Sequence, residues 1–170
     1  MDGTSEQHKS KAAVVGSIQV AIITISDSRN PETDPNGEYL QEQIRSIGNR
    51  VVDYRVIPDD PERLTEALEE VSASGAQVLL LNGGTGISKR DNTFDALSQH
   101  LEKVIPGFGE LFRMLSYEQV GSAAMLSRAI AGTYRDLLVF STPGSPKAVL
   151  LAWEKLILPE LQHMVWEMSR

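Results

Sequence analysis

The sequence predicts an α/β protein in which helices cover both faces of a mostly parallel central sheet. Three observations favour this three-layer α/β/α sandwich. Short apolar segments alternate with segments of helical period along the chain. The apolar segments, such as residues 18–26 and 77–81, are apolar on both sides, as in strands covered on both faces. Glycine, proline and polar residues gather where these segments end, as at the ligand-binding edge of such sheets.

The periodicity and the turn residues place the individual elements. Strands are expected over residues 18–26, 50–57, 77–81 and 137–141. Helices are expected over residues 38–47, 93–104, 109–119, 122–130 and 147–158. Another helix is expected to begin at Pro61, with Asp60 as its N-cap. Pro159 is expected to interrupt the last helix before a short amphipathic end.

The beginning of the chain differs from the rest in composition. Residues 1–16 are rich in Ser, Lys, Gln and Gly and show no periodicity, so a disordered tail is expected there. Residues 17–170 are expected to form a single domain, because this length suits one hydrophobic core.

The overall composition excludes several classes of function. A net charge of -7 argues against a nucleic-acid partner, which requires a basic face. No apolar segment is long enough to span a bilayer, and the polar start does not resemble a secretory signal, so no membrane partner is expected. The chain has no cysteine, which excludes disulfides and thiolate metal sites. A cytoplasmic location is the expectation.

Small and polar residues follow each expected strand. Because the carboxyl ends of parallel strands meet at one edge of a sheet, these residues predict a small-molecule site there. They are Ser26 and Asp27 after the first strand, Asp59 after the second, Gly83, Gly84, Thr85 and Gly86 after the third, and Pro143, Gly144 and Ser145 after the fourth.

The glycine-rich loop at residues 83–86 allows two interpretations. Its backbone can approach a ligand closely and turn N–H groups toward an anion. The same pattern is equally typical of a tight turn between a strand and a helix. Its spacing is that of neither the Rossmann loop nor the P-loop.

Two loop carboxylates are candidates for catalysis and for Mg²⁺ binding. Asp59 and Asp91 lie at neighbouring strand ends, and Mg²⁺ prefers a pair of carboxylates with water and phosphate oxygens. Helix capping is the alternative for Asp91, which precedes a helix by two residues. Asp60 is preferred as the cap of its own helix, which leaves Asp59 free to point at a ligand. The histidines are expected to lie away from the site, in the tail and on helices.

Several motifs occur in an order that resembles the MoaB/MogA family. The resemblance extends from about residue 18 to about residue 161, and residues 108–131 are more similar to the MoaB branch. The motifs are TISDS (24–28), NGGTG (82–86), RDNT (90–93), PGFGELFR (106–113), LSRA (126–129) and PGSPK (143–147).

The resemblance implies a molybdopterin-binding-domain fold, with a pocket for molybdopterin beside one for ATP. The implied reaction joins AMP to the terminal phosphate of molybdopterin, releases pyrophosphate and uses Mg²⁺. Two family aspartates essential for it match Asp59 and Asp91. Ser127, Arg128 and Lys147 become candidates for anion contacts. Other molybdenum cofactor biosynthesis proteins are possible partners by the same resemblance.

The resemblance also implies a trimer or hexamer. A group of Trp153, Met164, Trp166 and Met168 is expected to be a core or subunit-interface stripe. The last helices are expected to carry more apolar surface than a small monomer needs.

Two departures from the family pattern concern polar positions. Asn82 stands where Thr is frequent, and Asn36 stands in an Asp-x-Ser-Gly pattern; altered contacts are expected, with binding retained. Alternative functions are a non-catalytic molybdopterin carrier of the same fold and a molybdenum-insertion domain, which usually belongs to a longer chain. A flavodoxin-like regulator would not explain several family motifs in order.

Overall fold

The structure is a computed structural model that describes residues 16–170. The expectation of a disordered tail therefore falls, except for Gly16, outside the described residues. The strands are β1 (Gln19–Ile25), β2 (Arg50–Ile57), β3 (Val78–Asn82), β4 (Lys103–Val104), β5 (Ile130–Tyr134) and β6 (Leu137–Thr142). The helices are η1 (Pro31–Thr33), α2 (Pro35–Ser46), α3 (Pro61–Ala73), α4 (Thr93–His100), α5 (Pro106–Val120), η2 (Gly121–Leu126), α6 (Pro146–Ala152), η3 (Trp153–Ile157) and α7 (Leu158–Met168).

Six strands form one sheet in the order β2-β1-β3-β6-β5-β4. The four expected strands, β2, β1, β3 and β6, are parallel, and β5 and β4 extend the sheet in antiparallel pairing. The prediction of a mostly parallel sheet is confirmed. Because the chain goes from β1 to β2 on one side and to β3 on the other, strand order reverses between β1 and β3, where such sheets bind ligands.

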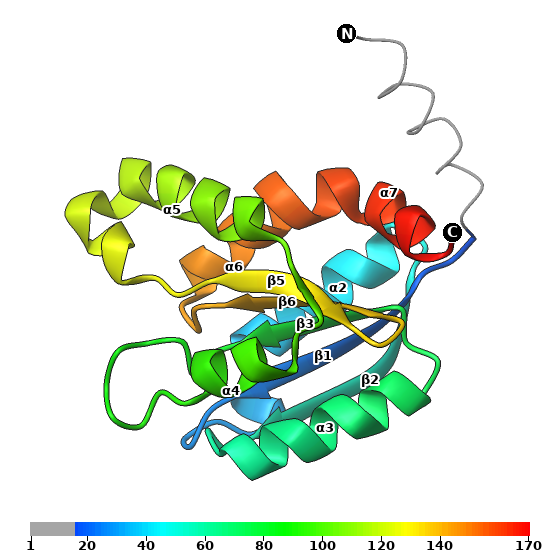
Figure 1. The fold of residues 1–170 in the computed structure, drawn as a ribbon, viewed down its shortest axis with the longest axis horizontal. Coiled ribbons are helices and arrows are strands. Elements are labelled where there is room, and N and C mark those ends of the chain that lie inside the picture. Colours follow the sequence, from blue (N-terminus) through cyan, green and yellow to red (C-terminus); the bar gives the residue numbers. More distant parts are fainter. Residues whose placement is uncertain (1–15) are drawn as a thin grey trace, which may run out of the picture.

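Helices cover both faces of this sheet, as expected for strands that are apolar on both sides (Figure 1). On β1, Val20 and Ile22 join a core cluster with residues of α2, α5, α6, η3 and α7. Ala21 and Ile23 point to the other face and join a cluster with residues of α3 and α4. The alternation follows from the two-residue period of a strand, and it confirms the three-layer prediction.

Aspartate side chains cap the N-termini of two helices that begin near the carboxyl ends of the parallel strands. The side chain of Asp60 accepts hydrogen bonds from the N–H groups of Glu62 and Arg63, and Pro61 follows it, as predicted. Asp34 caps α2 in the same way by accepting from the N–H of Asn36. Helix α2 begins at Pro35, three residues before the expected start.

The expected helix at residues 122–130 is wrong. A 3-10 turn occupies Gly121–Leu126, and Ile130 begins strand β5, which pairs with both β6 and β4. The expected helix at 93–104 ends at His100, since Lys103 and Val104 form β4.

The interruption expected at Pro159 is also wrong, because the helix continues through it. A π-helical turn over Trp153–Ile157 precedes the proline, and the Leu158 N–H donates to the carbonyl of Trp153. This wider turn shifts the hydrogen-bond register just before the residue that lacks an N–H.

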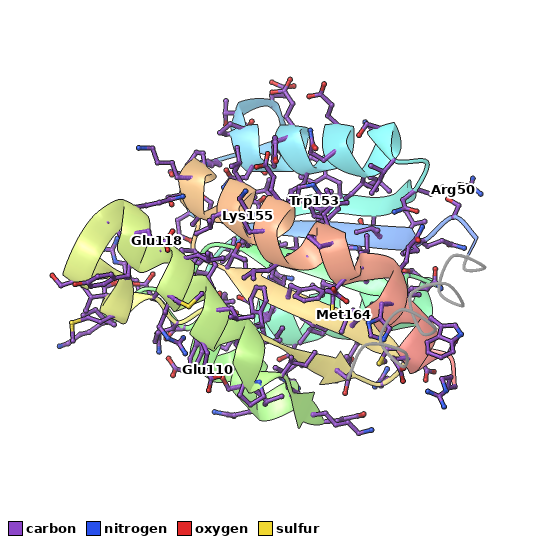
Figure 2. The ribbon with its side chains drawn as sticks, turned by 90° about the horizontal axis from the view of Figure 1, so that it is seen from above. Arg50, Glu110, Glu118, Trp153, Lys155 and Met164 are labelled. Atoms are coloured by element: carbon purple, nitrogen blue, oxygen red, sulfur yellow. The ribbon has the colours of Figure 1, made fainter. Side chains whose placement is uncertain are left out.

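The tryptophan and methionine group on the last helices is mostly core. Trp153 is fully buried, and Met164 and Met168 pack against the same cluster. Figure 2 looks onto this face, where Trp153 lies at the α6–η3 helix and Glu110 and Glu118 extend from α5. The inference that these residues form excess apolar surface is therefore corrected. Exposed apolar side chains lie mainly on α5 and η2 instead, at Leu111, Met114, Tyr117, Val120, Met125 and Leu126.

Within residues 16–170, no helix is long and apolar enough to cross a membrane.

The β4–β5 pairing, which the sequence did not predict, can be tested at Gly132. A Cβ at this position would overlap the carbonyl oxygen of Lys103. We expect Gly132→Ala to lower the free energy of unfolding by about 1–3 kcal/mol, because the strands must move apart. The matched control is Gly107→Ala in the first turn of α5, where a Cβ meets nothing within 4 Å. This control should be neutral or stabilising by up to about 1 kcal/mol. Equal denaturation midpoints for the two variants would contradict the close pairing.

Candidate functional site

A cavity of about 580 Å³ lies at the carboxyl ends of β1, β3 and β6. Its floor is formed by the loops that follow these strands, and α5 with η2 forms a wall that overhangs it. The residues that line it on the floor are Ile25, Ser26, Ser28, Arg29, Asn82, Gly83, Gly84, Thr85, Gly86, Asp91, Pro143, Gly144 and Ser145. The wall contributes Phe112, Ser116, Gln119, Val120, Ala123, Ala124, Leu126 and Ser127, and α6 contributes Lys147, Ala148 and Leu151.

The glycine-rich loop after β3 packs tightly against its surroundings. Gly83 and Gly84 have φ angles of 105° and 64°, in the region that favours glycine. A Cβ at residue 83 would overlap the carbonyl oxygen of Ile25. A Cβ at residue 84 would lie 2.7 Å from Asp59 Oδ2, and one at residue 86 would lie 2.7 Å from Asp91 Oδ2. The glycines thus let both candidate carboxylates contact one loop.

The expectation that Asp59 is free holds for only one of its two carboxylate oxygens. Its Oδ1 accepts from the N–H of Asn92 (3.2 Å) and from the Thr93 hydroxyl (3.1 Å), so it caps α4 from a distant part of the chain. Its Oδ2 lies beside Gly84. The capping role that was considered for Asp91 therefore belongs to Asp59, through one of its two oxygens.

Asp91 closes its own loop and faces the cavity. Its Oδ2 accepts from the N–H of Ser88 (3.0 Å), and its N–H donates to the Ser88 carbonyl (3.1 Å). The N-cap of α4 is Asn92, whose side chain makes no capping bond. Asp91 is thus a pocket residue and does not cap the helix.

The two carboxylates differ in acidity. Burial raises the pKa of Asp59, and the negative charges of Asp91 and Asp27 act in the same direction, against the hydrogen bonds from Asn92 and Thr93. Hydrogen bonds from Ser88 lower the pKa of Asp91, and the positive charge of Arg128 adds to this. Asp91 therefore holds its charge more readily than Asp59.

Arg128 organises the glycine-rich loop from outside the cavity. Its guanidinium donates to the carbonyls of Thr85 (3.1 Å), Gly86 and Asp91 (3.0 Å) and to both oxygens of Asp95. All three of its nitrogens are thereby engaged. Arg128 is not among the residues that line this cavity, and it crosslinks the loop that does. Its contact with a bound anion stays a prediction.

The remaining expected site residues take different places. Ser26 Oγ accepts from the N–H groups of Ser28 and Arg29, and Ser145 Oγ accepts from the N–H of Ala148 as the N-cap of α6. Asp27 lies outside the cavity lining, where it accepts from the N–H of Asp59. The exposed Lys147 lines the cavity.

Ser127 lines the cavity, and its hydroxyl oxygen is buried and, among the residues described, has no hydrogen-bond partner. Its contact with a bound anion stays a prediction.

Sequence reasoning missed Arg29 and the α5–η2 wall. Arg29 lines the cavity and lies 3.6 Å from the buried Asp34 carboxylate, measured from Nη1 to Oδ1. Its place immediately after Ser26-Asp27-Ser28 was the available signal. The wall could not be found in this way, because nothing local shows that α5 folds over the strand ends.

The acidic residues suit Mg²⁺ only together with a ligand. In the described part of the chain, no group of three or more His, Cys, Asp or Glu side chains is arranged to hold a metal ion. The electrostatic effect of Asp91 and Asp27 on Asp59 shows that carboxylates gather here. One or two carboxylates completed by phosphate oxygens and water is the usual Mg²⁺ environment in nucleotide sites, so the donor set fits that ion.

The pKa shifts predict opposite stability effects for two isosteric variants in EDTA. The raised pKa of Asp59 means that its charge destabilises the fold at neutral pH, so Asp59→Asn should melt at a higher temperature at pH 7. Its amide oxygen can still cap α4. Asp91→Asn should melt lower at pH 7, because a lowered pKa reflects a charge that the fold stabilises.

Thermal melts from pH 7 downward test both signs. The gain of Asp59→Asn should vanish as the pH falls to the ordinary carboxyl value of 3.8. The loss in Asp91→Asn should close as the pH falls below 3.8, through the pKa of the folded protein. Shifts of the same sign in both variants at pH 7 would contradict the assigned environments.

Comparison with known proteins agrees with this geometry. A family model described as a probable molybdopterin binding domain matches residues 21–163. The molybdenum cofactor biosynthesis protein B of Bacillus cereus is 49% identical over 166 residues, which cover 96% of this chain and 97% of that protein.

Solved structures show the same relationship. The crystal structure of a molybdenum cofactor biosynthesis protein B superposes with a TM-score of 0.87 at 50% identity, covering 91% of this chain and 97% of that one. The tungsten cofactor synthesizing protein MoaB from Pyrococcus furiosus superposes with a TM-score of 0.83 at 35% identity, covering 92% and 100%. The resemblance to the MoaB/MogA family is thereby confirmed. This chain belongs to the molybdopterin-binding domain family, in which the molybdenum cofactor biosynthesis proteins B are its relatives.

Proposed function

We propose that this chain acts in molybdenum cofactor biosynthesis by transferring the adenylyl group of ATP to the terminal phosphate of molybdopterin, with release of pyrophosphate. The observation that carries the proposal is the placement of Asp59 and Asp91 against one glycine-rich loop. This loop and Asp91 line the cavity, whereas Asp59 contacts the loop from outside the cavity lining. The family relationship supplies the substrate class. The cytoplasm is the compartment proposed for the reaction.

The cavity suits a flat heterocycle with an anionic end. Its volume of about 580 Å³ lies within the usual range for small-molecule sites. Val120, Ala123 and Leu126 are exposed and offer apolar surface on the wall. Arg29 and Lys147 are the two basic side chains that line it, and they would attract phosphate in a chain whose net charge is -7.

The transfer requires positioning and charge neutralisation more than covalent help from the protein. A phosphate oxygen of molybdopterin forms a bond to the α-phosphorus of ATP. The bond from that phosphorus to the oxygen of the β-phosphate breaks, and its electron pair leaves with pyrophosphate. Asp59 Oδ2 and Asp91 would hold Mg²⁺ beside residues 84–86, and the ion would neutralise charge on the phosphates.

If the chain has the proposed activity, replacing either aspartate by asparagine should strongly reduce turnover. Asp59→Asn and Asp91→Asn should each lower turnover on the order of 10²–10³, as is typical for removal of a preorganised electrostatic contact. Molybdopterin affinity should be largely retained, because most of the residues that line the cavity belong to other segments. The assay is pyrophosphate release with ATP, Mg²⁺ and molybdopterin.

The matched control is Asp60→Asn, one residue from Asp59, which exchanges one good N-cap for another. Wild-type turnover is expected for this control. Wild-type turnover from either Asp59→Asn or Asp91→Asn would remove that residue from the mechanism. A wild-type protein that binds molybdopterin and releases no pyrophosphate would favour the carrier alternative.

We also propose that the chain assembles into a trimer-based oligomer through the apolar side chains of α5 and η2. Leu111, Met114 and Tyr117 are exposed on successive turns of α5, and Met125 on η2 is 77% exposed. A group of exposed apolar side chains on one helix and the turn that follows it often marks an interface.

A charge placed on this surface should dissociate the oligomer. Met114→Glu is expected to reduce the mass measured by light scattering to that of a monomer, because a buried carboxylate would be unpaired. Ile47→Glu, at an exposed apolar residue on the end of α2, is the control and should leave the mass unchanged. A monomeric wild type at all concentrations would contradict the proposed assembly.

A further inference from the structure

A continuous chain of buried hydrogen bonds lies between α2 and the carboxyl ends of β1 and β3. The Thr24 hydroxyl donates to Asp34 Oδ2 (2.5 Å), and Asn82 Nδ2 donates to Thr24 Oγ1 (2.9 Å). Asn36 Nδ2 then donates to both Asn82 Oδ1 (2.8 Å) and the carbonyl of Gly144 (2.9 Å). The four side chains are each at most 2% exposed, so water does not compete for these bonds.

The direction of each bond is fixed from the two ends of this chain. Asp34 Oδ2 accepts from both the Thr24 hydroxyl and the Tyr54 hydroxyl, so the hydroxyl hydrogen of Thr24 is committed to Asp34. The Thr24 oxygen can then only accept, which turns the NH₂ group of Asn82 toward it and leaves Asn82 Oδ1 facing Asn36. The Gly144 carbonyl also only accepts. Asn36 must therefore offer two N–H groups, which a hydroxyl side chain at this position could not do.

The two groups that Asn36 joins belong to neighbouring segments of the cavity floor. Asn82 leads into the glycine-rich loop, and Gly144 lies in the loop between β6 and α6; both line the cavity, whereas Asn36 does not. The two loops touch, since a Cβ at residue 144 would lie 3.2 Å from the Cα of Gly83. The same β6–α6 loop continues to Lys147.

We propose that Asn36 is a positioning residue, which sets the separation of the glycine-rich loop from the β6–α6 loop and thereby the affinity for a ligand that contacts both. The identity of that ligand rests on the proposed function, but the coupling of the two loops does not. A loop that moves by about 1 Å at a site of this kind can cost on the order of 10²-fold in rate.

The isosteric variant Asn36→Asp tests this role. It replaces the two N–H donors by an oxygen that faces Asn82 Oδ1 and the Gly144 carbonyl, both acceptors, so the loops should separate. We expect the Kd for molybdopterin, titrated without ATP or Mg²⁺, to rise about tenfold, which corresponds to about 1.4 kcal/mol. Amide hydrogen exchange should accelerate at Gly83 and Gly144 and stay unchanged at Gly48 and Gly75, which lie elsewhere.

Asn49→Ala provides the control for simple loss of stability. Asn49 is also buried, and its Oδ1 accepts from the N–H of Ile18 (3.0 Å) at the amino ends of β1 and β2, away from the cavity. This variant should lower the melting temperature without changing the Kd or the exchange at Gly144. If Asn36→Asp behaves in the same way as Asn49→Ala, Asn36 is merely structural and the proposal is overturned.

A second variant covers the case in which Asn36→Asp does not fold. Thr24→Val keeps the volume of the side chain and removes the oxygen that orients Asn82, so the Kd and the exchange at Gly144 should shift in the same direction. Unchanged values in a folded Thr24→Val would overturn the proposal. A wild type without adenylyl transfer or without molybdopterin binding would refute the proposed function alone, because the exchange measurements still decide whether Asn36 holds the loops.

Discussion

The glycine-rich loop after β3 packs so closely against its neighbours that carboxylate and backbone oxygens occupy the space that the Cβ atoms of larger residues would need. Gly83 rests against the Ile25 carbonyl, and Gly84 rests against Asp59 and Thr93. Any larger residue would push β1, α4 and the loop apart. The position of both carboxylates, the three carbonyls that Arg128 holds and the contact with the β6–α6 loop all depend on this close packing.

The same few residues both stabilise and destabilise the fold. Asp59 stabilises the start of α4 through one oxygen, yet burial and neighbouring negative charge make its ionised form unfavourable. Arg128 offsets part of that charge without entering the cavity. Sites that must bind a charged ligand commonly sacrifice stability in this way. The stability lost at the site is offset by the apolar burial of the parallel strands, which are covered on both faces of the sheet.

The elements that could be predicted from the sequence are those whose signals are local. The continuous apolar runs of β1 and β3 predicted covered parallel strands, and Asp60 followed by Pro61 predicted the start of α3. Strand β5 was missed because its hairpin with β6 turns at Arg135 and Asp136, without the usual Asn-Gly signal. Arg135 adopts a φ of 52° there, which is uncommon for a residue with a side chain.

At the candidate site, too, features with a local sequence signal could be predicted, and contacts between distant residues could not. The loops at the strand ends were found because their composition is unusual. The cap that Asp59 supplies to α4 joins residues 33 positions apart, and the crosslink from Arg128 to Thr85 joins residues 43 apart. No pattern along the chain encodes such pairs. The role of Asn36 is likewise visible only once α2 is placed against the ends of β1, β3 and β6.

The short strand β4 has a consequence for how copies of this chain can meet. With only Lys103 and Val104, it offers an incoming strand few free backbone groups, and its lysine would be buried by such pairing. At the opposite edge, β2 carries Arg50 and the ion pair of Arg55 with Asp53. Both ends of the sheet thus resist extension by another strand. In the assembly proposed above, contact between copies would then fall to the helical flanks, and the sheet of each copy would stay separate from that of its neighbour.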